Sequence, residues 1–353
     1  CRMAIPYFLA GNIAESGTYF RQKDGHYENL GIRRLEGSVS ALDATKRRLT
    51  LAGGESVSFD RMLIATGSRP SMLPVEGLDT PGVHACWTLA DARNIASRVR
   101  DGGRVVLIGA GFVACIIMQA LVKRGAKLTL VTGSSGRMVR SMMDPTAGGL
   151  IMRWCQEKGV HIISGCRVAG FEAGPVVHLN SGDSLDADLI VVAAGVRPNS
   201  EFAADAGVAA ENGIDVDEYL QTNVEGVFAA GDVARGPDFS TRTRSVHAIQ
   251  PTATEHGRTA AMNMAGRAVP YRGSLGMNVL DSMGLISTSF GRWQGDEGGD
   301  ETIQLDEERF RYMNLQFTED RLIGVNSVGL TENIGALRGL IQNRVRLGAW
   351  KER

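Results

Sequence analysis

The sequence has few aromatic residues, few cysteines and no excess of charge of either sign. Aromatic residues make up 6% of the 353 residues, and 38 basic against 39 acidic residues give a formal net charge of -1. No basic stretch is long, so nothing in the composition favours nucleic acid or anionic lipid as a partner. The apolar runs are far shorter than the roughly 20 residues of a membrane-spanning helix. We therefore expect no nucleic-acid partner and no membrane association.

The five cysteines are Cys1, Cys86, Cys115, Cys155 and Cys166, an odd number without a C-x-x-C spacing. This pattern predicts neither a disulfide framework nor a thiol redox pair. Reduced cysteines are typical of the cytoplasm, and we expect that location. The histidines lack the spacing of metal ligands, so we expect no metal.

Glycine, by contrast, is abundant, with 44 residues, and 43% of the chain is hydrophobic. This mixture is typical of an α/β enzyme with tight turns between strands and helices. Residues 104–131 (RVVLIGAGFVACIIMQALVKRGAKLTLV) predict a strand, a glycine turn, a helix and a second strand, which together form a βαβ unit. The length allows two or three domains.

The turn of this βαβ unit, GAGFVA, is a dinucleotide-binding fingerprint. Gly109 permits the tight turn, Gly111 lets a pyrophosphate approach the backbone, and Ala114 allows the helix to pack closely on the strand. The N–H groups at Phe112 and Val113, in the first helical turn, are available to phosphates. We therefore predict a site for NAD(P)H.

The second strand of the unit ends in Thr132, where an acidic residue would normally bind the ribose of NAD. Without a carboxylate to repel a 2′-phosphate, and with Ser134, Ser135, Arg137 and Arg140 nearby, the sequence slightly favours NADPH. The alternative is that these residues form a solvated loop and that NADH binds without the carboxylate.

Three further segments indicate a family. FDRMLIATGSRP (residues 59–70), TNVEGVFAAGDVA (222–234) and LIVVAAGVRPNS (189–200) resemble signatures of the FAD-dependent pyridine nucleotide-disulfide oxidoreductase superfamily. RMAIPYFLAG near the start and LIQNRVRLGAW near the end look most like the branch with nitrite reductase NAD(P)H-binding subunits, NADH oxidases and rubredoxin reductases. The resemblance extends from about residue 1 to the C-terminus.

The resemblance implies an FAD site. Gly231 would let the backbone approach FAD, and Asp232 would accept hydrogen bonds from a ribityl or ribose hydroxyl. Ala65, Thr66 and Gly67 would lie beside the ADP portion of the flavin.

The resemblance also assigns roles to one helix N-terminus, to the end of one strand and to Arg2. A helix starting at Pro251 and Thr252 would point its N-terminus toward the flavin pyrimidine ring and stabilise negative charge on the reduced ring. Ala194 and Gly195 would belong to the NAD(P) site, at the exit of the nicotinamide domain. Arg2 would lie near the flavin, with a surface cation as the alternative.

The implied fold is α/β, with two Rossmann-like dinucleotide-binding domains of the three-layer ββα type and a C-terminal α+β domain. Residues 1–97 and 215–267 would form the FAD-binding domain, residues 98–214 the NAD(P)-binding domain, and residues 268–353 the C-terminal interface domain. In relatives the last domain often forms the dimer interface, so we expect a homodimer.

The sequence departs from the family pattern in three places. It begins at Cys1 without the first βαβ unit that would carry the FAD fingerprint, so we expect a truncated chain with a weakened flavin site; lipidation of Cys1 is the alternative. Met3 stands where thiol-using relatives place a reactive cysteine, which disfavours disulfide chemistry. Ile116 stands where many relatives carry a glutamate that holds the nicotinamide.

We therefore predict an FAD-dependent NAD(P)H oxidoreductase that passes electrons to a redox protein, a partner subunit, oxygen or a quinone. Hydride passes directly between the two cofactors, so no catalytic side chain is assigned. His247, Glu255 and His256 could move protons near the flavin, with structural roles as the alternative. The alternative function is a non-catalytic regulatory or interaction subunit that binds nucleotides.

Overall fold

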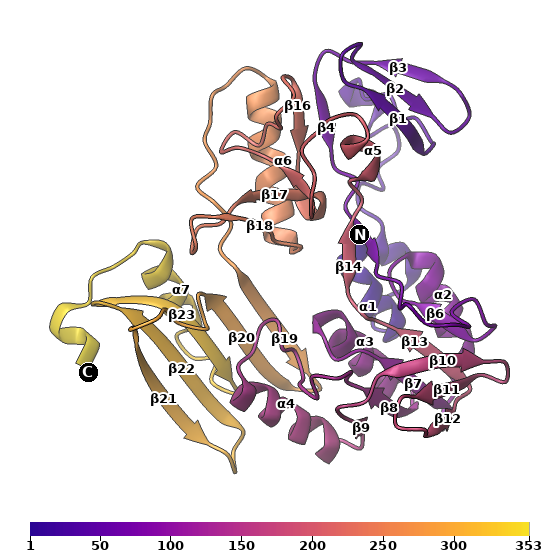
Figure 1. Cartoon of the computed structure of the whole chain (residues 1–353), viewed down its shortest axis with the longest axis vertical. Helices are drawn as coiled ribbons and strands as arrows, with labels where there is room; N and C mark the ends of the chain where they lie inside the picture. The colour runs from indigo at the N-terminus through magenta and orange to yellow at the C-terminus, as the bar shows by residue number, and fades with distance from the viewer. Residues whose placement is uncertain (353) are drawn as a thin grey trace. The chain divides into compact units, whose positions relative to one another are not determined.

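A computed structural model describes residues 1–352 of the chain (Figure 1). These residues form two compact units. The first unit contains Cys1–Thr18, Pro70–Gly195 and the chain from Met277 onward, and the second contains Tyr19–Arg69 and Val196–Gly276. Each unit combines segments that are far apart in the sequence, so contacts of long sequence separation hold it together.

The first unit is organised around a five-stranded parallel sheet. In spatial order its strands are β6 (Val83–Ala85), β13 (Leu189–Val192), β7 (Arg104–Ile108), β8 (Lys127–Val131) and β9 (His161–Ile163). Helix α3 (Phe112–Lys123) connects β7 to β8, where Leu107 pairs with Leu130. The predicted βαβ unit is confirmed.

Alternate residues of this sheet face two different layers. Leu107 and Val191 pack in one core with the helices, whereas Ile108 and Val192 pack in another core with a second, antiparallel sheet. The helices of this unit before the C-terminal sheet are α1 (Ile5–Leu9), α2 (Leu89–Arg98), α3 and α4 (Pro145–Glu157), with 3-10 turns η1 (Arg2–Ala4) and η2 (Glu15–Thr18). The second sheet contains β10 (Val168–Glu172), β11 (Val176–Leu179) and β12 (Ser184–Asp186). This is the expected three-layer ββα arrangement.

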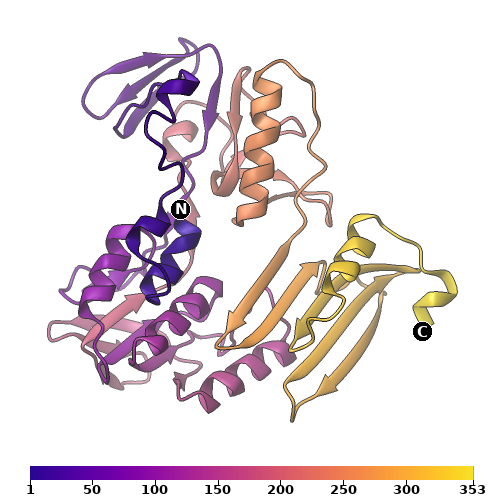
Figure 2. The ribbon, with the colours of Figure 1, turned by 180° about the vertical axis from the view of Figure 1, so that it is seen from behind.

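The C-terminal part of the first unit is a five-stranded antiparallel sheet. In spatial order its strands are β19 (Met277–Ser282), β20 (Leu285–Gly291), β23 (Arg321–Val328), β22 (Arg311–Thr318) and β21 (Asp300–Asp306), followed by α7 (Ile334–Gln342) and η5 (Gly348–Glu352). Figures 1 and 2 both show α4 alongside this sheet.

Helix α4 and the C-terminal sheet are joined by hydrogen bonds between buried groups. Tyr312 Oη donates to Asp144 Oδ2 at 2.7 Å, and Asn326 Oδ1 accepts the Asp144 N–H at 2.7 Å. Asn326 Nδ2 donates to the carbonyl of Met142 at 3.0 Å. Tyr312 and Asn326 are almost completely buried, so these bonds fix the start of α4 on the sheet.

The second unit contains several small sheets and one long helix. The strands β1 (Val39–Asp43), β2 (Arg48–Leu51) and β3 (Ser56–Ser58) form an antiparallel meander. β4 (Met62–Ile64) pairs in parallel with β16 (Val227–Ala229). The other elements are η3 (Glu28–Leu30), β5 (Ser68–Pro70), β14 (Val196–Pro198), α5 (Glu201–Ala204), β15 (Ile214–Asp215), η4 (Gly231–Val233), β17 (Ala234–Pro237), β18 (Arg244–Val246) and α6 (Gln250–Met264).

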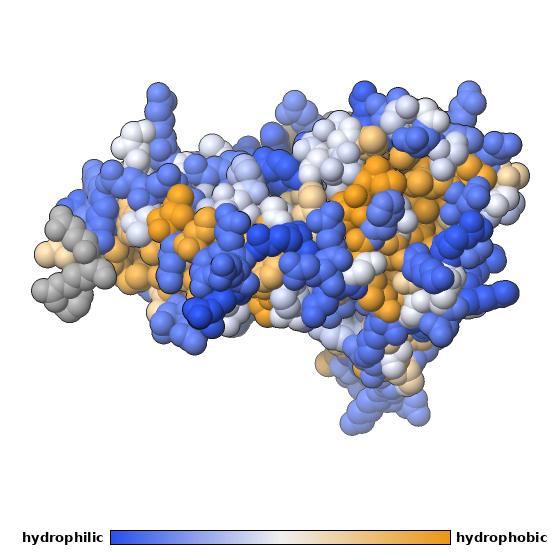
Figure 3. All heavy atoms as spheres, turned by 90° about the horizontal axis from the view of Figure 1, so that it is seen from below, coloured by the Kyte–Doolittle hydropathy of each residue, from blue (hydrophilic) through white to orange (hydrophobic). Residues whose placement is uncertain are grey.

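The described part of the chain, residues 1–352, has no helix with the length and hydrophobicity that crossing a bilayer requires. On the face seen in Figure 3, hydrophobic residues gather in one broad area and in smaller ones, and hydrophilic residues separate these areas.

Candidate functional site

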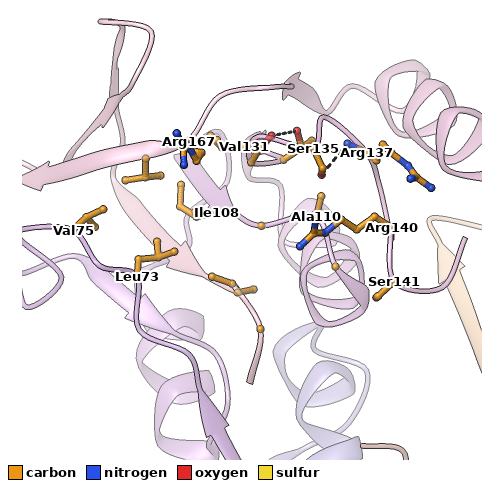
Figure 4. Close-up of a pocket in the computed structure, with 18 of the residues that line it drawn as sticks. Leu73, Val75, Ile108, Ala110, Val131, Ser135, Arg137, Arg140, Ser141 and Arg167 are labelled. Carbon is orange, nitrogen blue, oxygen red and sulfur yellow. Dashed lines mark hydrogen bonds between the residues drawn. The ribbon is translucent and has the colours of Figure 1, made fainter. Parts of the chain in front are cut away.

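The first unit has a cavity of about 620 Å³ at the carboxyl ends of its parallel strands (Figure 4). Ligands of open α/β sheets bind at this edge. The lining residues come from the ends of β7, β8 and β13 and from loops around them: Leu73, Pro74, Val75, Ile108, Gly109, Ala110, Gly111, Val131, Thr132, Gly133, Ser135, Arg137, Arg140, Ser141, Arg167, Val168, Asn180, Ala193, Ala194 and Gly195.

The glycine turn has the geometry that a dinucleotide requires. Gly109 has a φ of +109°, and a Cβ there would lie 2.4 Å from the carbonyl oxygen of Ala193, so only glycine fits. A Cβ at Gly111 would have no neighbour within 4 Å, which leaves open space for a pyrophosphate. Gly111 is also the N-cap of α3 and has no side chain to cap the helix. The first N–H groups of α3 can therefore bind a phosphate.

The cavity is lined by cations and has no carboxylate among its lining residues. Arg137, Arg140 and Arg167 all line it, and Figure 4 shows Arg140 extending toward Ala110. Arg137 also donates from Nη2 to the carbonyl of Met143 at 3.0 Å. The lining is thus suited to a ligand with more than one phosphate group.

Arg167 and Asn180 are among the lining residues that were not found from the sequence. Arg167 and Asn180 are linked by two hydrogen bonds: the Arg167 N–H donates to Asn180 Oδ1 at 2.7 Å, and the Asn180 N–H donates to the Arg167 carbonyl at 2.9 Å. They lie just before β10 and just after β11, outside the βαβ unit. No local motif marks them, because only the packing of the second sheet brings them to the cavity.

The predicted NAD(P)-binding residues divide into two groups. Gly109, Gly111, Thr132, Arg137, Ala194 and Gly195 line the cavity, whereas the side chains of Phe112 and Val113 pack against the core. Ile116 also packs against this core. Phe112 and Val113 can therefore contact a ligand only through their backbone N–H groups, at the N-terminus of α3.

The predicted flavin residues of the second unit meet around the turn after β16. Gly231 has a φ of +74°, and its N–H donates to Nδ1 of His256 at 3.4 Å. Ser68 Oγ donates to Asp232 Oδ2 at 2.8 Å. Thr252, in the first turn of α6, is buried. The glycine turn at Gly231, the Asp232 carboxylate and the first turn of α6 therefore lie close together in the second unit.

The Ala65-Thr66-Gly67 segment is held by Asn199. Thr66 Oγ1 donates to the Asn199 carbonyl at 2.8 Å, and Asn199 Nδ2 donates to the Thr66 carbonyl at 2.9 Å. Gly67 has a φ of +67°, and a Cβ there would have no neighbour within 4 Å. Gly67 lies next to Ser68, the hydrogen-bond partner of Asp232. Because Gly67 has no side chain, the polar groups of a flavin nucleotide could approach the backbone there.

Arg2 belongs to the first unit. Its guanidinium lies 4.3 Å from the centre of the Trp87 ring. This stacking is a cation–π contact, which gives Arg2 a structural partner within its own unit.

Comparison with known proteins identifies the family. The family model described as pyridine nucleotide-disulphide oxidoreductase matches residues 6–257. The chain belongs to this family. It is therefore an oxidoreductase that uses FAD and NAD(P)H, and the predicted family is confirmed.

Individual relatives agree with this assignment. The epsilon subunit of an NADH-dependent phenylglyoxylate dehydrogenase from Aromatoleum evansii is 33% identical over 99% of this chain and 84% of its own length. An electron transfer subunit of assimilatory nitrate reductase from Bacillus subtilis is 28% identical over 94% of this chain, which spans only 43% of that subunit. A crystal structure of a ferredoxin reductase from Rhodopseudomonas palustris, 25% identical, matches with a TM-score of 0.84 over 93% of this chain and 81% of that one. The predicted fold class is confirmed.

In this family FAD supplies a ring that takes hydride from the nicotinamide. The chain's own contribution is to bind and orient. Gly109 and Gly111 would position the dinucleotide, and Gly231 and Asp232 would hold the flavin's hydroxyl-bearing chain. No side chain needs to carry a proton for the hydride transfer itself.

The structure separates the three candidates for proton movement. His256 is 1% exposed, and burial, with a smaller effect of His247, lowers its pKa to about 4, so it stays neutral. Glu255 Oε2 accepts a hydrogen bond from Tyr271 Oη at 3.2 Å. His247 Nε2 lies 2.8 Å from Asp238 Oδ2 in a largely buried pair. These contacts favour a structural role for His256 over proton movement.

Three of the five cysteines are not suited to thiol chemistry. Cys86, Cys115 and Cys155 are buried, and burial raises the pKa of Cys86 and Cys155 to about 12. Burial also raises the pKa of Cys115. These three thiols therefore remain protonated at neutral pH and are poor nucleophiles.

Proposed function

We propose that this oxidoreductase takes hydride from NADPH onto FAD and passes the electrons directly to a redox carrier protein or a partner subunit. The observation that carries the proposal is the dinucleotide cavity, where a glycine turn with room for a pyrophosphate faces three arginines and no carboxylate. A 2′-phosphate would be attracted to such a lining, whereas the acid that NAD-binding relatives use for the ribose is replaced by Thr132.

The proposed acceptor is supported by the relatives and by the cysteines. One relative is described as an electron transfer subunit and another as a ferredoxin reductase, and both descriptions name a protein as the partner in electron transfer. The buried thiols, and Met3 in place of a reactive cysteine, argue against a disulfide as the acceptor. Direct electron transfer from the flavin to a protein requires no reactive thiol.

The experiment is anaerobic reduction of the FAD-loaded protein, followed through its visible absorbance. We expect the visible absorbance of oxidised flavin to bleach with NADPH and to return when a ferredoxin or rubredoxin is added. A flavin that stays oxidised with both NADPH and NADH would favour the alternative, a non-catalytic nucleotide-binding subunit. Ile116, which offers no carboxylate for the nicotinamide, is the observation that supports that alternative.

We also propose a homodimer in the cytoplasm. The C-terminal sheet supports the dimer, because its edge strands β19 and β21 expose the apolar side chains of Val279, Ile303 and Leu305. The free cysteines support the location. Sedimentation velocity of the FAD-loaded protein tests the dimer: a single species with the mass of one chain would refute it.

The division into domains is proposed on the family pattern: residues 1–97 and 215–267 for FAD, 98–214 for NAD(P), and 268–353 for the interface domain. The roles of the predicted site residues are proposed on the same basis. Limited proteolysis tests the boundaries, since cuts should fall near residues 97, 214 and 267 if the domains are independent.

A further inference from the structure

The first unit has a second cavity, of about 410 Å³, beside the dinucleotide cavity. It lies between the N-terminus of α4 and the strands β21 and β22. Its lining combines cations, amides, carboxylates and an indole: Arg137, Arg140, Asp144, Pro145, Thr146, Trp293, Gln294, Glu301, Ile303, Tyr312, Asn314 and Gln316. Arg137 and Arg140 line both cavities.

The wall that β22 contributes is polar where an apolar one is usual. Its alternate residues Tyr312, Asn314 and Gln316 are 2%, 6% and 8% exposed. A sheet face that packs against a helix normally carries apolar side chains at such positions. Gln316 Nε2 donates to Asn314 Oδ1 at 2.8 Å and to Glu301 Oε2 at 3.1 Å, so the amides are oriented by one another. Buried amides held in this way form a prearranged polar surface.

The opposite side of the cavity is suited to a phosphate group. Pro145 and Thr146 lie in the first turn of α4, whose N-terminus carries partial positive charge and is capped by Asp144, with Oδ1 accepting the Ala147 N–H at 2.8 Å. Arg137 and Arg140 add two full charges. Arg137 is held by its bond from Nη2 to the Met143 carbonyl, and Arg140 is exposed, so its guanidinium can turn toward a ligand.

We propose that the second cavity binds an adenine mononucleotide of the AMP or ADP class, separately from the dinucleotide. Each part of such a ligand has a counterpart in the lining. Trp293 offers a surface for base stacking. Gln316 Oε1 and the second Nδ2–H of Asn314, which the bonds among these side chains leave over, offer an acceptor for adenine N6 and a donor for N7. Glu301 accepts from ribose hydroxyls as acids do in dinucleotide sites. The arginines and the helix N-terminus bind the phosphates.

The size of the cavity agrees with this class of ligand, because about 410 Å³ lies within the range of small-molecule sites. The mixed lining also disfavours simpler ligands. Inorganic phosphate would leave the Trp293 ring without a ligand to stack on, and a purely apolar ligand would remove water from Arg140 and Glu301 without replacing its hydrogen bonds.

The shared arginines couple the two cavities. A phosphate bound in the second cavity draws Arg137 and Arg140 away from the dinucleotide, so ADP weakens NADPH binding; this part rests on the proposed function. Two separate sites predict that the KM for NADPH rises with ADP and then levels off, because the coupling energy is finite. Competition for a single site would instead raise KM without limit.

The binding test uses the FAD-loaded protein saturated with NADP+, titrated with ADP by isothermal calorimetry. We expect one equivalent of ADP to bind while NADP+ occupies the first cavity. Trp293→Leu should weaken ADP binding roughly tenfold, the usual effect of losing base stacking, and Gln316→Leu should weaken it by a similar factor. Gln304→Leu is the matched control, since Gln304 is exposed on the neighbouring strand and pairs with Met313, which faces away from the cavity.

Three results would overturn the proposal: no heat with ADP in the NADP+-saturated protein, binding that Trp293→Leu leaves unchanged, or a KM for NADPH that rises without a plateau. Melting temperatures show whether Gln316→Leu still folds, and Trp293→Leu, at a residue of intermediate exposure, gives a second variant if it does not. The titration involves no hydride transfer, so it gives a result even if NADPH fails to reduce the flavin.

Discussion

The hydroxyl of Ser68 donates a hydrogen bond to the carboxylate of Asp232 across a sequence separation of 164 residues. This bond joins the two segments that resemble flavin-site signatures, one ending at β5 and the other at η4. Ser68 is almost fully buried, so water cannot easily replace the bond. Asp232 is thereby oriented before any flavin hydroxyl reaches it.

Asp232→Asn should weaken FAD binding by roughly tenfold or more, because hydrogen bonds to a charged group contribute about 1.5–3 kcal/mol. Ser68→Ala should have a smaller effect in the same direction, since it removes only the orienting bond. Quenching of flavin fluorescence on titration measures both. Ser97→Ala, on an exposed face of α2, is the control. Equal FAD affinity for wild type and Asp232→Asn would contradict the assigned role.

Gly109→Ala should raise the KM for NADPH at least tenfold, an order-of-magnitude estimate from the cost of a strained backbone. The new methyl group would clash with the Ala193 carbonyl, and the φ of +109° would be strained in any L-residue. Stopped-flow flavin reduction measures the effect.

The control for Gly109→Ala is Gly149→Ala in α4. A Cβ at Gly149 would have no neighbour within 4 Å, and alanine is the better helix former. Its KM should stay unchanged and its melting temperature should rise slightly. If the two alanine variants had the same KM, the tight turn would not be needed for dinucleotide binding.

Arg167→Glu should reverse the cofactor preference. The arginine lines the dinucleotide cavity, and a glutamate would repel a 2′-phosphate while accepting a ribose hydroxyl. We expect the ratio of kcat/KM for NADPH over NADH to fall by on the order of 100-fold, equivalent to a few kcal/mol of charge reversal. Arg309→Glu, on an exposed turn of the C-terminal sheet, should leave the ratio unchanged. A wild-type ratio below one would refute the NADPH preference directly.

Stability should depend on pH through His256. Burial lowers its pKa in the folded protein to about 4, below the ordinary value of 6.5. Between these values the unfolded chain binds a proton that the folded chain does not, so the free energy of unfolding is highest above pH 6.5 and falls as pH decreases toward 4. The loss is on the order of 3 kcal/mol over that window.

Urea unfolding at roughly pH 7.5, 6.5 and 5.5 measures this slope, because these values span the range in which an ordinary histidine titrates. His256→Asn keeps an acceptor near the Gly231 N–H but does not titrate, so its slope should be flatter. His161→Asn, at an exposed histidine, should keep the wild-type slope. A wild-type slope in His256→Asn would show that another group is responsible.

The sequence predicted the parts of the fold that depend on local pattern. The βαβ unit was found because its apolar runs and its glycine turn are adjacent in the chain. Gly109 and Gly111 were found for the same reason. The partition of the chain into units, by contrast, depends on packing between distant segments.

The residues that sequence reasoning missed are those that packing alone brings to a site. Arg167 and Asn180 reach the dinucleotide cavity only because the second sheet covers the first. Asn199 holds Thr66 from 133 residues away. The pattern of Tyr312, Asn314 and Gln316 alternates as in any half-exposed strand, so nothing in it indicated that these polar residues are buried.

The attachment of Asp144 to Tyr312 and Asn326 has a consequence for cofactor choice. The loop that presents Arg137 and Arg140 ends at the residues this attachment fixes, so the C-terminal sheet sets where those cations stand. A chimaera that exchanges this sheet for a relative's would therefore alter nucleotide selectivity, although every residue of the glycine fingerprint stayed the same.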